Sequence, residues 1–342
     1  MTLTGRPYGP AVARYRVRVP RKTTSSALRG RLLRALAACA VLLALAGYLV
    51  VHFSSAGPGA PRCTVRGDGK DGSRYELDPE QAVNAATIEA VGSSRGLPER
   101  AVTIALATAM QESGLRNIDY GDRDSVGLFQ QRPTQGWGTV EEIMDPVYAA
   151  GKFYDHLVEV PGYSRLPLTV AAQKVQRSGY PQAYAKHEPD AALLSSALTG
   201  RLPQALSCTT GRAAEPGNPA LVREKLRRDF GRDVLAGGPE RADGADASGQ
   251  GGGAGKSRPE PVIGVPVPDG SGAGGARRGW ELAHWAVAHA SELGIAQVSY
   301  AGRVWSASDS GGEWREADGG FSPAGGSGTD PGSGTVLIST VQ

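Results

Sequence analysis

The stretch from Pro98 to Ser113, PERAVTIALATAMQES, restricts the fold of this chain more than any other segment. Wound as a helix, it is uncharged and apolar on nearly every side from Ala101 to Met110. Such a helix belongs in the middle of a core, so other helices must surround it. Pro98 suits the first position of the helix, and Gly114 ends it.

Further helices are expected on both sides of this one. Most have a start signal, which is a proline in the first turn or an aspartate just before it. No hairpin pattern occurs between Pro79 and Gly200, and this predicts a domain that is mostly or wholly α-helical. The expected helices start at Pro79, Pro98, Pro146, Leu168 and Pro189.

The N-terminal segment has the pattern of a membrane anchor. Residues 1–34 carry nine basic side chains and no acidic one, and residues 35–51 are uncharged and nearly all apolar. This pattern predicts a single transmembrane helix over residues 35–53 that contacts the lipid bilayer, with the basic tail in the cytoplasm and the chain after about residue 54 outside. A cleaved signal peptide is the alternative. Because the basic tail adjoins the apolar run, it indicates topology, and no nucleic-acid partner is expected.

The remaining segments flank the helical domain. Gly 48 and Pro 23 make up about a fifth of the chain, which indicates spacer segments. Residues 54–75 are expected to form a stalk, and residues 209–278 a linker with one charged helix and a disordered Gly/Pro-rich part. Residues 279–342 are expected to form a small α/β module. His284 and His289 in this module lie five positions apart, so a helix does not place both on one face for a metal.

Two cysteines flank the helical domain, and a third, Cys39, lies in the apolar run. Outside the cell, Cys63 and Cys208 are expected to form a disulfide. The bridge would close a loop of about 146 residues, for which the chain-entropy model gives at most about 5 kcal/mol. Two unrelated free thiols are the alternative.

Glu112 is a lone carboxylate at the C-terminal end of the apolar helix. Burial against apolar side chains disfavours its anion, and the negative end of the helix dipole does the same. Both effects raise the pKa, and a carboxylic acid that keeps its proton near neutral pH can act as a general acid. The alternative is an ordinary helix-end glutamate, solvated or paired with Arg116.

The loop that follows, NIDYGDRDS, supplies Asp119, Asp122 and Asp124. It lacks the glycine and the final glutamate of a calcium loop, and Arg123 stands among the possible ligands. Carboxylates in such a loop commonly cap their own backbone. No metal or other cofactor is therefore expected.

Three short motifs in this region resemble the lysozyme-like superfamily. Glu112-Ser113, the Gly-Asp-Arg at residues 121–123 and the Gly-Leu-Phe-Gln at residues 127–130 stand in the order ES, GDR and GLMQ found in soluble lytic transglycosylases and goose-type lysozymes. The resemblance covers roughly residues 76–208. It is greatest to the lysozyme-like domain of membrane-anchored actinobacterial cell-wall proteins.

The resemblance implies an α-rich fold in two lobes, with a groove for the β-1,4-linked glycan strands of peptidoglycan and Glu112 as the catalytic acid. One carboxylate suffices for a transglycosylase, whereas a hydrolase normally needs a second. Asp122 matches one acid of the goose-type pattern and is the possible second acid. The other acid of that pattern is replaced by Arg132, and the transglycosylase AYNAG segment is replaced by VQRSG at residues 175–179.

The expected function is thus peptidoglycan cleavage of the lytic-transglycosylase type, and the alternative is a catalytically inactive scaffold that binds the cell wall. A glycan groove needs aromatic surfaces and hydrogen-bonding side chains. Tyr184 or Tyr180 could supply a hydroxyl donor, and for Trp137 core packing is an equal alternative. Protein partners are not indicated. The glycan-binding candidates are Ser113, Gln130, Gln131, Trp137 and Tyr184.

Overall fold

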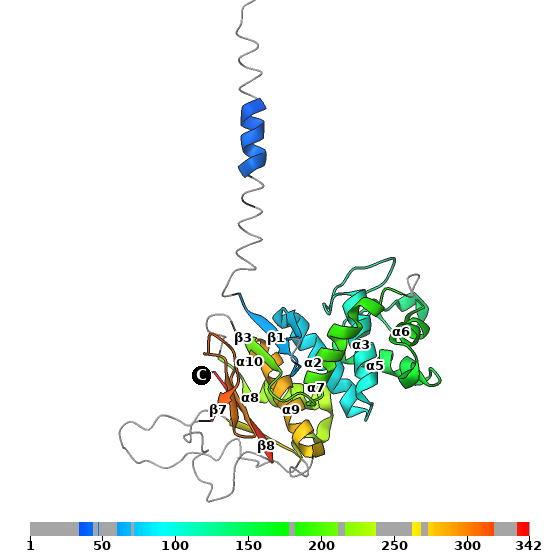
Figure 1. The fold of residues 1–342 in the computed structure, drawn as a ribbon. Helices are drawn as coiled ribbons and strands as arrows, with labels where there is room; N and C mark the ends of the chain where they lie inside the picture. The colour runs from blue at the N-terminus through cyan, green and yellow to red at the C-terminus, as the bar shows by residue number, and fades with distance from the viewer. Residues whose placement is uncertain are drawn as a thin grey trace, which may run out of the picture. The chain divides into compact units, whose positions relative to one another are not determined.

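The computed structural model describes residues 34–43, 47, 60–69, 72–177, 182–210, 216–236, 262–267, 273–317 and 334–341. The chain divides into two compact units, residues 1–58 and residues 59–342. Every helix and strand labelled in Figure 1 belongs to the second unit.

In the first unit, residues 34–43 are helical. At 1.5 Å per residue this stretch is about 15 Å long, whereas the hydrocarbon core of a bilayer is about 30 Å thick. Among the described residues, no helix is long and apolar enough to cross a membrane. The predicted fold class is therefore wrong in its transmembrane helix over residues 35–53, of which residues 44–46 and 48–53 lie outside the described part of the chain.

Helices surround α3 (Glu99–Glu112), whose residues from Ala101 to Met110 are all buried. The predicted start signal at Asp145 is confirmed, since its carboxylate accepts a hydrogen bond of 3.0 Å from the backbone N–H of Val147, whereas α3 begins one residue after Pro98. The other helices of this part are α2 (Pro79–Ser94), α4 (Val140–Ile143), α5 (Pro146–Val158), α6 (Leu168–Gln176) and α7 (Glu188–Leu198), with short 3₁₀ helices at Pro133–Gln135, Tyr163–Arg165 and Ala185–His187.

A three-stranded antiparallel sheet lies beside these helices. β1 (Arg62–Arg66) is its central strand, between β2 (Arg74–Leu77) and β3 (Leu206–Thr209). β1 and the first two residues of β2 fall in residues 54–75, for which the sequence predicts a stalk. Gly67, Asp68 and Gly69 follow β1 directly, while the strands themselves bury residues such as Val65.

The predicted disulfide is confirmed, because Cys63 of β1 and Cys208 of β3 are bonded to each other. The two residues are paired partners in the antiparallel register, with Cα atoms 4.0 Å apart. The bond joins the first and the last strand that frame the helical part, across a sequence separation of 145 residues.

A second antiparallel sheet has five strands in the order β4-β8-β5-β6-β7. Two sheets also contradict the prediction of a mostly α-helical fold. The strands are short, and β4 pairs with a strand far along the chain, so a local sequence pattern does not reveal the pairing. β4 itself lies in the predicted linker. The strands are β4 (Val262–Pro266), β5 (Ile295–Tyr300), β6 (Arg303–Ser306), β7 (Arg315–Glu316) and β8 (Thr335–Thr340).

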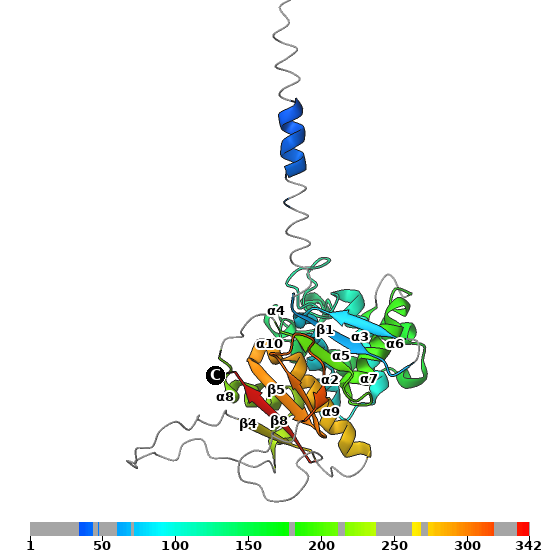
Figure 2. The same cartoon turned by 60° about the vertical axis from the view of Figure 1, so that its left-hand side comes forward.

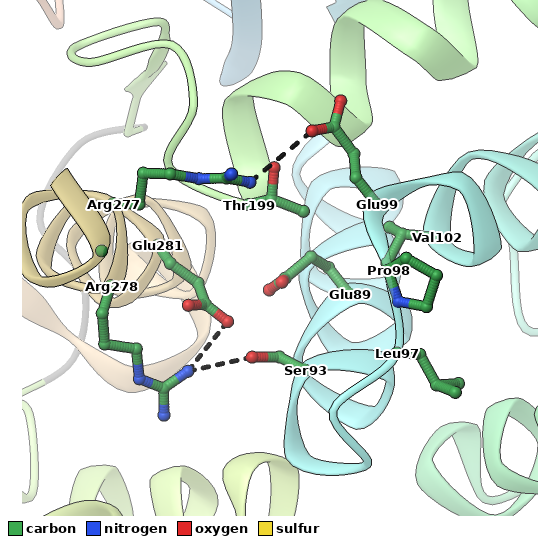
Figure 3. Close-up of a pocket in the computed structure, with 11 residues that line it drawn as sticks. Glu89, Ser93, Leu97, Pro98, Glu99, Val102, Thr199, Arg277, Arg278 and Glu281 are labelled. Carbon is green, nitrogen blue, oxygen red and sulfur yellow. Dashed lines mark hydrogen bonds and ion pairs between the residues drawn. The ribbon is translucent and has the colours of Figure 1, made fainter.

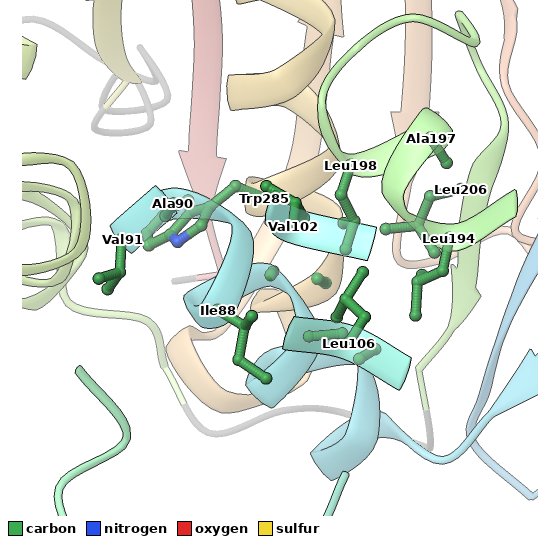
Figure 4. Packing of buried hydrophobic residues seen from close by; sticks show 14 of the residues in the cluster. Ile88, Ala90, Val91, Val102, Leu106, Leu194, Ala197, Leu198, Leu206 and Trp285 are labelled. Carbon is green, nitrogen blue, oxygen red and sulfur yellow. The ribbon is translucent and has the colours of Figure 1, made fainter. Parts of the chain in front are cut away.

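α9 (Ala273–Ala288) joins the second sheet to the helical part. It contacts β5 and β8 on one side and α2 and α7 on the other, as Figures 1 and 2 show. Trp285 of α9 belongs to the same cluster of buried residues as Ile88 and Leu106 (Figure 4). The apolar core is therefore continuous from the helical part to the second sheet. Two further helices, α8 (Pro219–Phe230) and α10 (Ala290–Leu293), and a 3₁₀ helix at Arg232–Leu235 complete this region.

Two tryptophans of the second sheet region bind to β3, which is an edge strand of the first sheet. The indole N–H of Trp305 donates to the carbonyl oxygen of Cys208 at 3.2 Å, and that of Trp314 donates to Leu206 at 2.9 Å. Backbone acceptors on the outer edge of the first sheet are thus satisfied by side chains from far along the chain.

Candidate functional site

The C-terminal end of α3 places Glu112 at the border between core and solvent. The helix ends because Gly114 adopts a left-handed conformation with φ of 64°, and its N–H bonds to the carbonyl oxygen of Met110 at 3.2 Å. Glu112 is half-buried, directly after the wholly buried residues of the helix. The local sequence thus carries one carboxyl group to the edge of a dry core.

Tyr184 is the hydrogen-bond partner that the structure gives to Glu112. Its hydroxyl donates to Glu112 Oε1 at 2.6 Å, and its side chain is fully buried. The two residues come from distant segments, since Tyr184 lies just before the 3₁₀ helix at Ala185–His187. Of the two tyrosines considered from the sequence, this is the one that reaches the acid, and Tyr180 lies outside the described residues.

Gln176, at the end of α6, is a second contact of Glu112 that sequence reasoning missed. Its amide hydrogen-bonds to the Glu112 carboxyl group and also donates to the carbonyl oxygen of Phe129 at 2.7 Å. It lies within the VQRSG segment that replaces AYNAG, and this position is the sequence signal that could have identified Gln176 as a site residue. The amide links the acid to the Gly-Leu-Phe-Gln segment.

The pKa of Glu112 is raised above its ordinary value, chiefly because burial disfavours the anion. The hydrogen bonds from Tyr184 and Gln176 act in the opposite direction, since they stabilise the anion. Arg116, the possible ion-pair partner considered from the sequence, forms its ion pair with Asp78 instead. Glu112 is therefore a carboxyl group with an elevated pKa and donors that can stabilise its charged form.

The neighbour of Glu112 on α3 also has a polar partner. Gln111 Oε1 lies 3.3 Å from Nε2 of His187, a histidine whose pKa is lowered by partial burial and by the nearby charge of Lys186. The neutral form of this imidazole is therefore favoured. Sequence reasoning missed this residue too, because the contact joins two distant segments.

Ser113 anchors the motif loop, which is the segment of residues 121–130 that carries the Gly-Asp-Arg and Gly-Leu-Phe-Gln motifs, to the end of α3. Its hydroxyl donates to the carbonyl oxygen of Leu128 at 2.7 Å. Gln130 holds the same loop, because its amide donates to the carbonyl oxygen of Tyr120 at 3.2 Å. A Cβ at Gly121 would lie 1.8 Å from Gln130 Oε1, so the glycine of the Gly-Asp-Arg motif leaves room for this side chain.

Two aspartates of the loop interact with groups other than Glu112. Asp122 is exposed, with 93% of its side chain accessible and the Arg123 guanidinium 3.9 Å away. Asp124 accepts hydrogen bonds from Thr134 at 2.6 Å and from Arg132 at 2.8 Å, and these bonds hold its pKa well below the ordinary range. The arginine that replaces the second acid of the goose-type pattern is thus paired with a loop carboxylate.

The other two glycan-binding candidates face the protein interior to different degrees. Gln131 is only 1% exposed, and its amide donates to the carbonyl oxygen of Ala149 at 3.0 Å. Trp137 is partly buried and meets the ring of His156 edge-on, with centroids 4.3 Å apart. Its backbone carbonyl accepts a hydrogen bond of 3.2 Å from Tyr148. Both side chains contribute to packing of the motif loop.

A cavity of about 480 Å³ lies at the other end of α3, lined among others by Glu99 and Val102 and not by Glu112. From Glu99 to Glu112 the helix rises about 20 Å, so the two places are separate. Among the described residues, no group of three or more His, Cys, Asp or Glu side chains is arranged to hold a metal ion.

No curated protein matches the chain. A family model described as VldE, C-terminal domain, matches residues 264–326, less than half of the sequence. The matched stretch contains α9, α10 and strands β5, β6 and β7, and it does not contain Glu112. This chain is thus similar to that family across α9 and part of the second sheet.

Proposed function

We propose that the chain cleaves the β-1,4 glycosidic bonds of peptidoglycan in the manner of a lytic transglycosylase, with Glu112 as its catalytic acid. The proposal rests on the resemblance of the region around residues 76–208 to the lysozyme-like superfamily. One structural observation supports it above the others. Glu112 is half-buried, with a raised pKa, and accepts a hydrogen bond of 2.6 Å from the buried hydroxyl of Tyr184.

The reaction needs a group that gives a proton and then takes one back. Glu112 donates its proton to the glycosidic oxygen as the bond from that oxygen to C1 of the sugar breaks. The 6-hydroxyl of the same sugar then attacks C1 and transfers its proton to the Glu112 carboxylate. The products are a 1,6-anhydro sugar and a free hydroxyl on the leaving sugar, and no water is consumed.

The surroundings of Glu112 suit both states of this cycle. Burial favours the protonated form that starts the reaction, while Tyr184 and Gln176 stabilise the anion that follows proton transfer. Ser113 and Gln176 both bond to backbone carbonyls of the 127–130 segment, so the acid is held against the motif loop.

A single-carboxylate mechanism is favoured over hydrolysis. Asp122 extends into solvent, and Asp124 is occupied by Arg132 and Thr134. Neither has a hydrogen bond to Glu112 or Tyr184 among the interactions of the described residues. Formation of an anhydro product requires no second carboxylate.

An extracytoplasmic location fits this activity and is part of the proposal. The disulfide between Cys63 and Cys208 supports it, because such bonds form and persist in oxidising compartments. The substrate of the proposed reaction also lies outside the cytoplasm.

The test is incubation of the full chain with purified cell-wall sacculi, followed by mass spectrometry of the released muropeptides. We expect 1,6-anhydro ends from the wild type, and a loss of about 100-fold or more for Glu112→Gln, which cannot donate a proton. Asp122→Asn is the matched control, and it keeps most of the activity under the proposed mechanism. If the wild type instead releases muropeptides with reducing ends, and Asp122→Asn abolishes their release, the reaction is hydrolysis.

The alternative is an inactive scaffold that binds the wall, favoured by one observation. Arg132 takes the place of a family acid and is paired with Asp124. If wild type and Glu112→Gln both release nothing while both sediment with sacculi, the scaffold is correct and the enzymatic proposal is wrong.

A further inference from the structure

The cavity at the start of α3 contains an unusual set of charges. It has a volume of about 480 Å³ and lies where α2, α3, the end of α7 and the first turns of α9 meet. Figure 3 shows carboxyl groups and guanidinium groups around it, with an apolar wall on the α3 side. The residues that carry the argument are Glu89, Ser93, Glu99, Arg277, Arg278 and Glu281.

Two of these carboxyl groups are buried and face each other. Glu89 of α2 is 2% exposed and Glu281 of α9 is 6% exposed, and Figure 3 shows their carboxyl groups pointing toward each other across the cavity. The pKa of Glu89 is raised well above its ordinary value by burial, and then by the charge of Glu281 and a hydrogen bond to it. Burial of two such groups without compensation is costly.

The cation beside this pair can balance only one of the two carboxyl groups when both are ionised. Arg278 Nη1 lies 2.8 Å from Glu281 Oε1, although the two are not aligned for a hydrogen bond and this oxygen has no hydrogen-bond partner among the described residues. The same guanidinium donates to Ser93 at 3.1 Å. Arg277 lies 3.6 Å from Glu99, on the other side of the cavity. One guanidinium therefore faces two buried carboxyl groups.

We propose that this cavity binds a small organic cation, a primary ammonium group on an aliphatic stem, with the ammonium against the paired carboxyl groups of Glu89 and Glu281. Leu97, Pro98 and Val102 provide the apolar wall along which the stem packs. An ammonium group has three donors, which can bond to the unpartnered Glu281 Oε1 and to the Glu89 carboxylate once Glu89 has released its proton. A divalent cation fits less well, since the charged Arg278 is beside the pair.

Binding of the cation is linked to release of a proton. In the empty cavity, burial and the charge of Glu281 favour a proton on Glu89, whose pKa is raised well above its ordinary value. The ammonium replaces that proton, so affinity increases with pH by up to tenfold per unit while Glu89 is protonated in the free protein.

The other charged or titratable groups around Glu89 are few. Arg277 and Arg278 come from α9, and Glu99 comes from α3 with Arg201 at 2.8 Å. Tyr154 of α5 interacts with Glu89, and burial holds the pKa of this tyrosine well above 10.0. The pH dependence is assigned to the Glu89–Glu281 pair, because burial and the charge of Glu281 raise the pKa of Glu89.

This inference is independent of the activity proposed for Glu112, because the cavity lies at the opposite end of α3. The probe is n-butylammonium, and 1-butanol is the neutral control of the same size. Binding to the full chain is measured by ligand-observed NMR titration between pH 5.5 and 7.5. Glu89→Gln has the shape of protonated glutamate, and Glu76→Gln, in an exposed pair with Arg74, is the matched control variant.

We expect n-butylammonium to bind the wild type and Glu76→Gln with affinity that rises with pH. Glu89→Gln is expected to bind at least tenfold more weakly and without the pH dependence. Equal binding of 1-butanol, equal affinity in Glu89→Gln, or no saturable binding to the wild type overturns the proposal. A separate titration with magnesium chloride can also overturn the proposal. Magnesium binding to the wild type that Glu89→Gln abolishes would identify a metal site instead.

Discussion

Removal of one oxygen atom from Tyr184 tests the proposed active site most directly. Tyr184→Phe keeps the buried ring and deletes the hydroxyl that donates to Glu112 Oε1 at 2.6 Å. A hydrogen bond to a charged group contributes about 1.5–3 kcal/mol, which corresponds to roughly 10- to 150-fold in rate if the bond is made to the anion that forms during the reaction. We therefore expect the rate of muropeptide release to fall by this factor.

The pH profile provides a second readout with a defined sign. The Tyr184 hydrogen bond lowers the pKa of Glu112 against the larger effect of burial. Without the hydroxyl, Glu112 keeps its proton to higher pH, so the alkaline limb of the rate profile should shift to higher pH. A variant that merely loosens the fold would lower the rate without this displacement.

Tyr154→Phe is the matched control for this experiment. Tyr154 is also fully buried, and its hydroxyl donates to the carbonyl oxygen of Ile88 at 3.0 Å, away from Glu112. Both variants should lose a similar amount of stability in urea unfolding, about 1 kcal/mol for each hydrogen bond. If Tyr184→Phe and Tyr154→Phe have the same rates and the same alkaline limb, the assignment of Tyr184 to the site is wrong.

Three further predictions concern the stability of the fold. The double variant Cys63→Ala with Cys208→Ala should lose up to about 5 kcal/mol in urea unfolding, because the lost bond closes a loop of 145 residues; a loss below about 1 kcal/mol would contradict the entropic argument. Glu89→Gln should become more stable than the wild type as pH rises above the ordinary glutamate value of 4.5, since a raised pKa in the folded state means that stability is lost with rising pH. The difference should grow by up to about 1.4 kcal/mol per pH unit in thermal or urea unfolding, and a flat difference from pH 5 to 7 would refute burial of the anion. Gly127→Ala should cost about 1–3 kcal/mol, because φ is 79° and the added Cβ would lie 2.8 Å from the carbonyl oxygen of Ile143; wild-type stability in urea unfolding would show that the loop can shift.

Local sequence signals predicted the parts of the fold that depend on single segments. From Ala101 to Met110, α3 is uncharged and apolar on nearly every side, so it requires a central position in the core. These residues are buried as expected. The disulfide followed from two cysteines that flank one patterned domain. The transmembrane prediction relied on the same kind of local signal, an apolar run. It failed because no described helix is long and apolar enough to cross a membrane.

Contacts between distant segments were harder to predict. β1 and β2 are short strands next to a glycine-rich, charged turn, and the pairing of β1 with β3 depends on residues more than a hundred positions away. Gln176 reaches Glu112 only because α6 packs near the end of α3, and no sequence spacing shows that contact. Glu89 and Glu281 likewise look like ordinary helical glutamates until α2 and α9 are seen together.

The tryptophan donors on β3 have a consequence for fragments of this chain. A piece that ends near residue 210 would keep α3, Glu112 and the disulfide, yet it would lose the indole groups of Trp305 and Trp314. The outer backbone acceptors of β3 would then be open to strands of neighbouring molecules, and unprotected edges of this kind promote self-association. Such a fragment should aggregate even though it contains every residue of the proposed catalytic site, so insolubility of the isolated helical part would reflect the missing cover on β3.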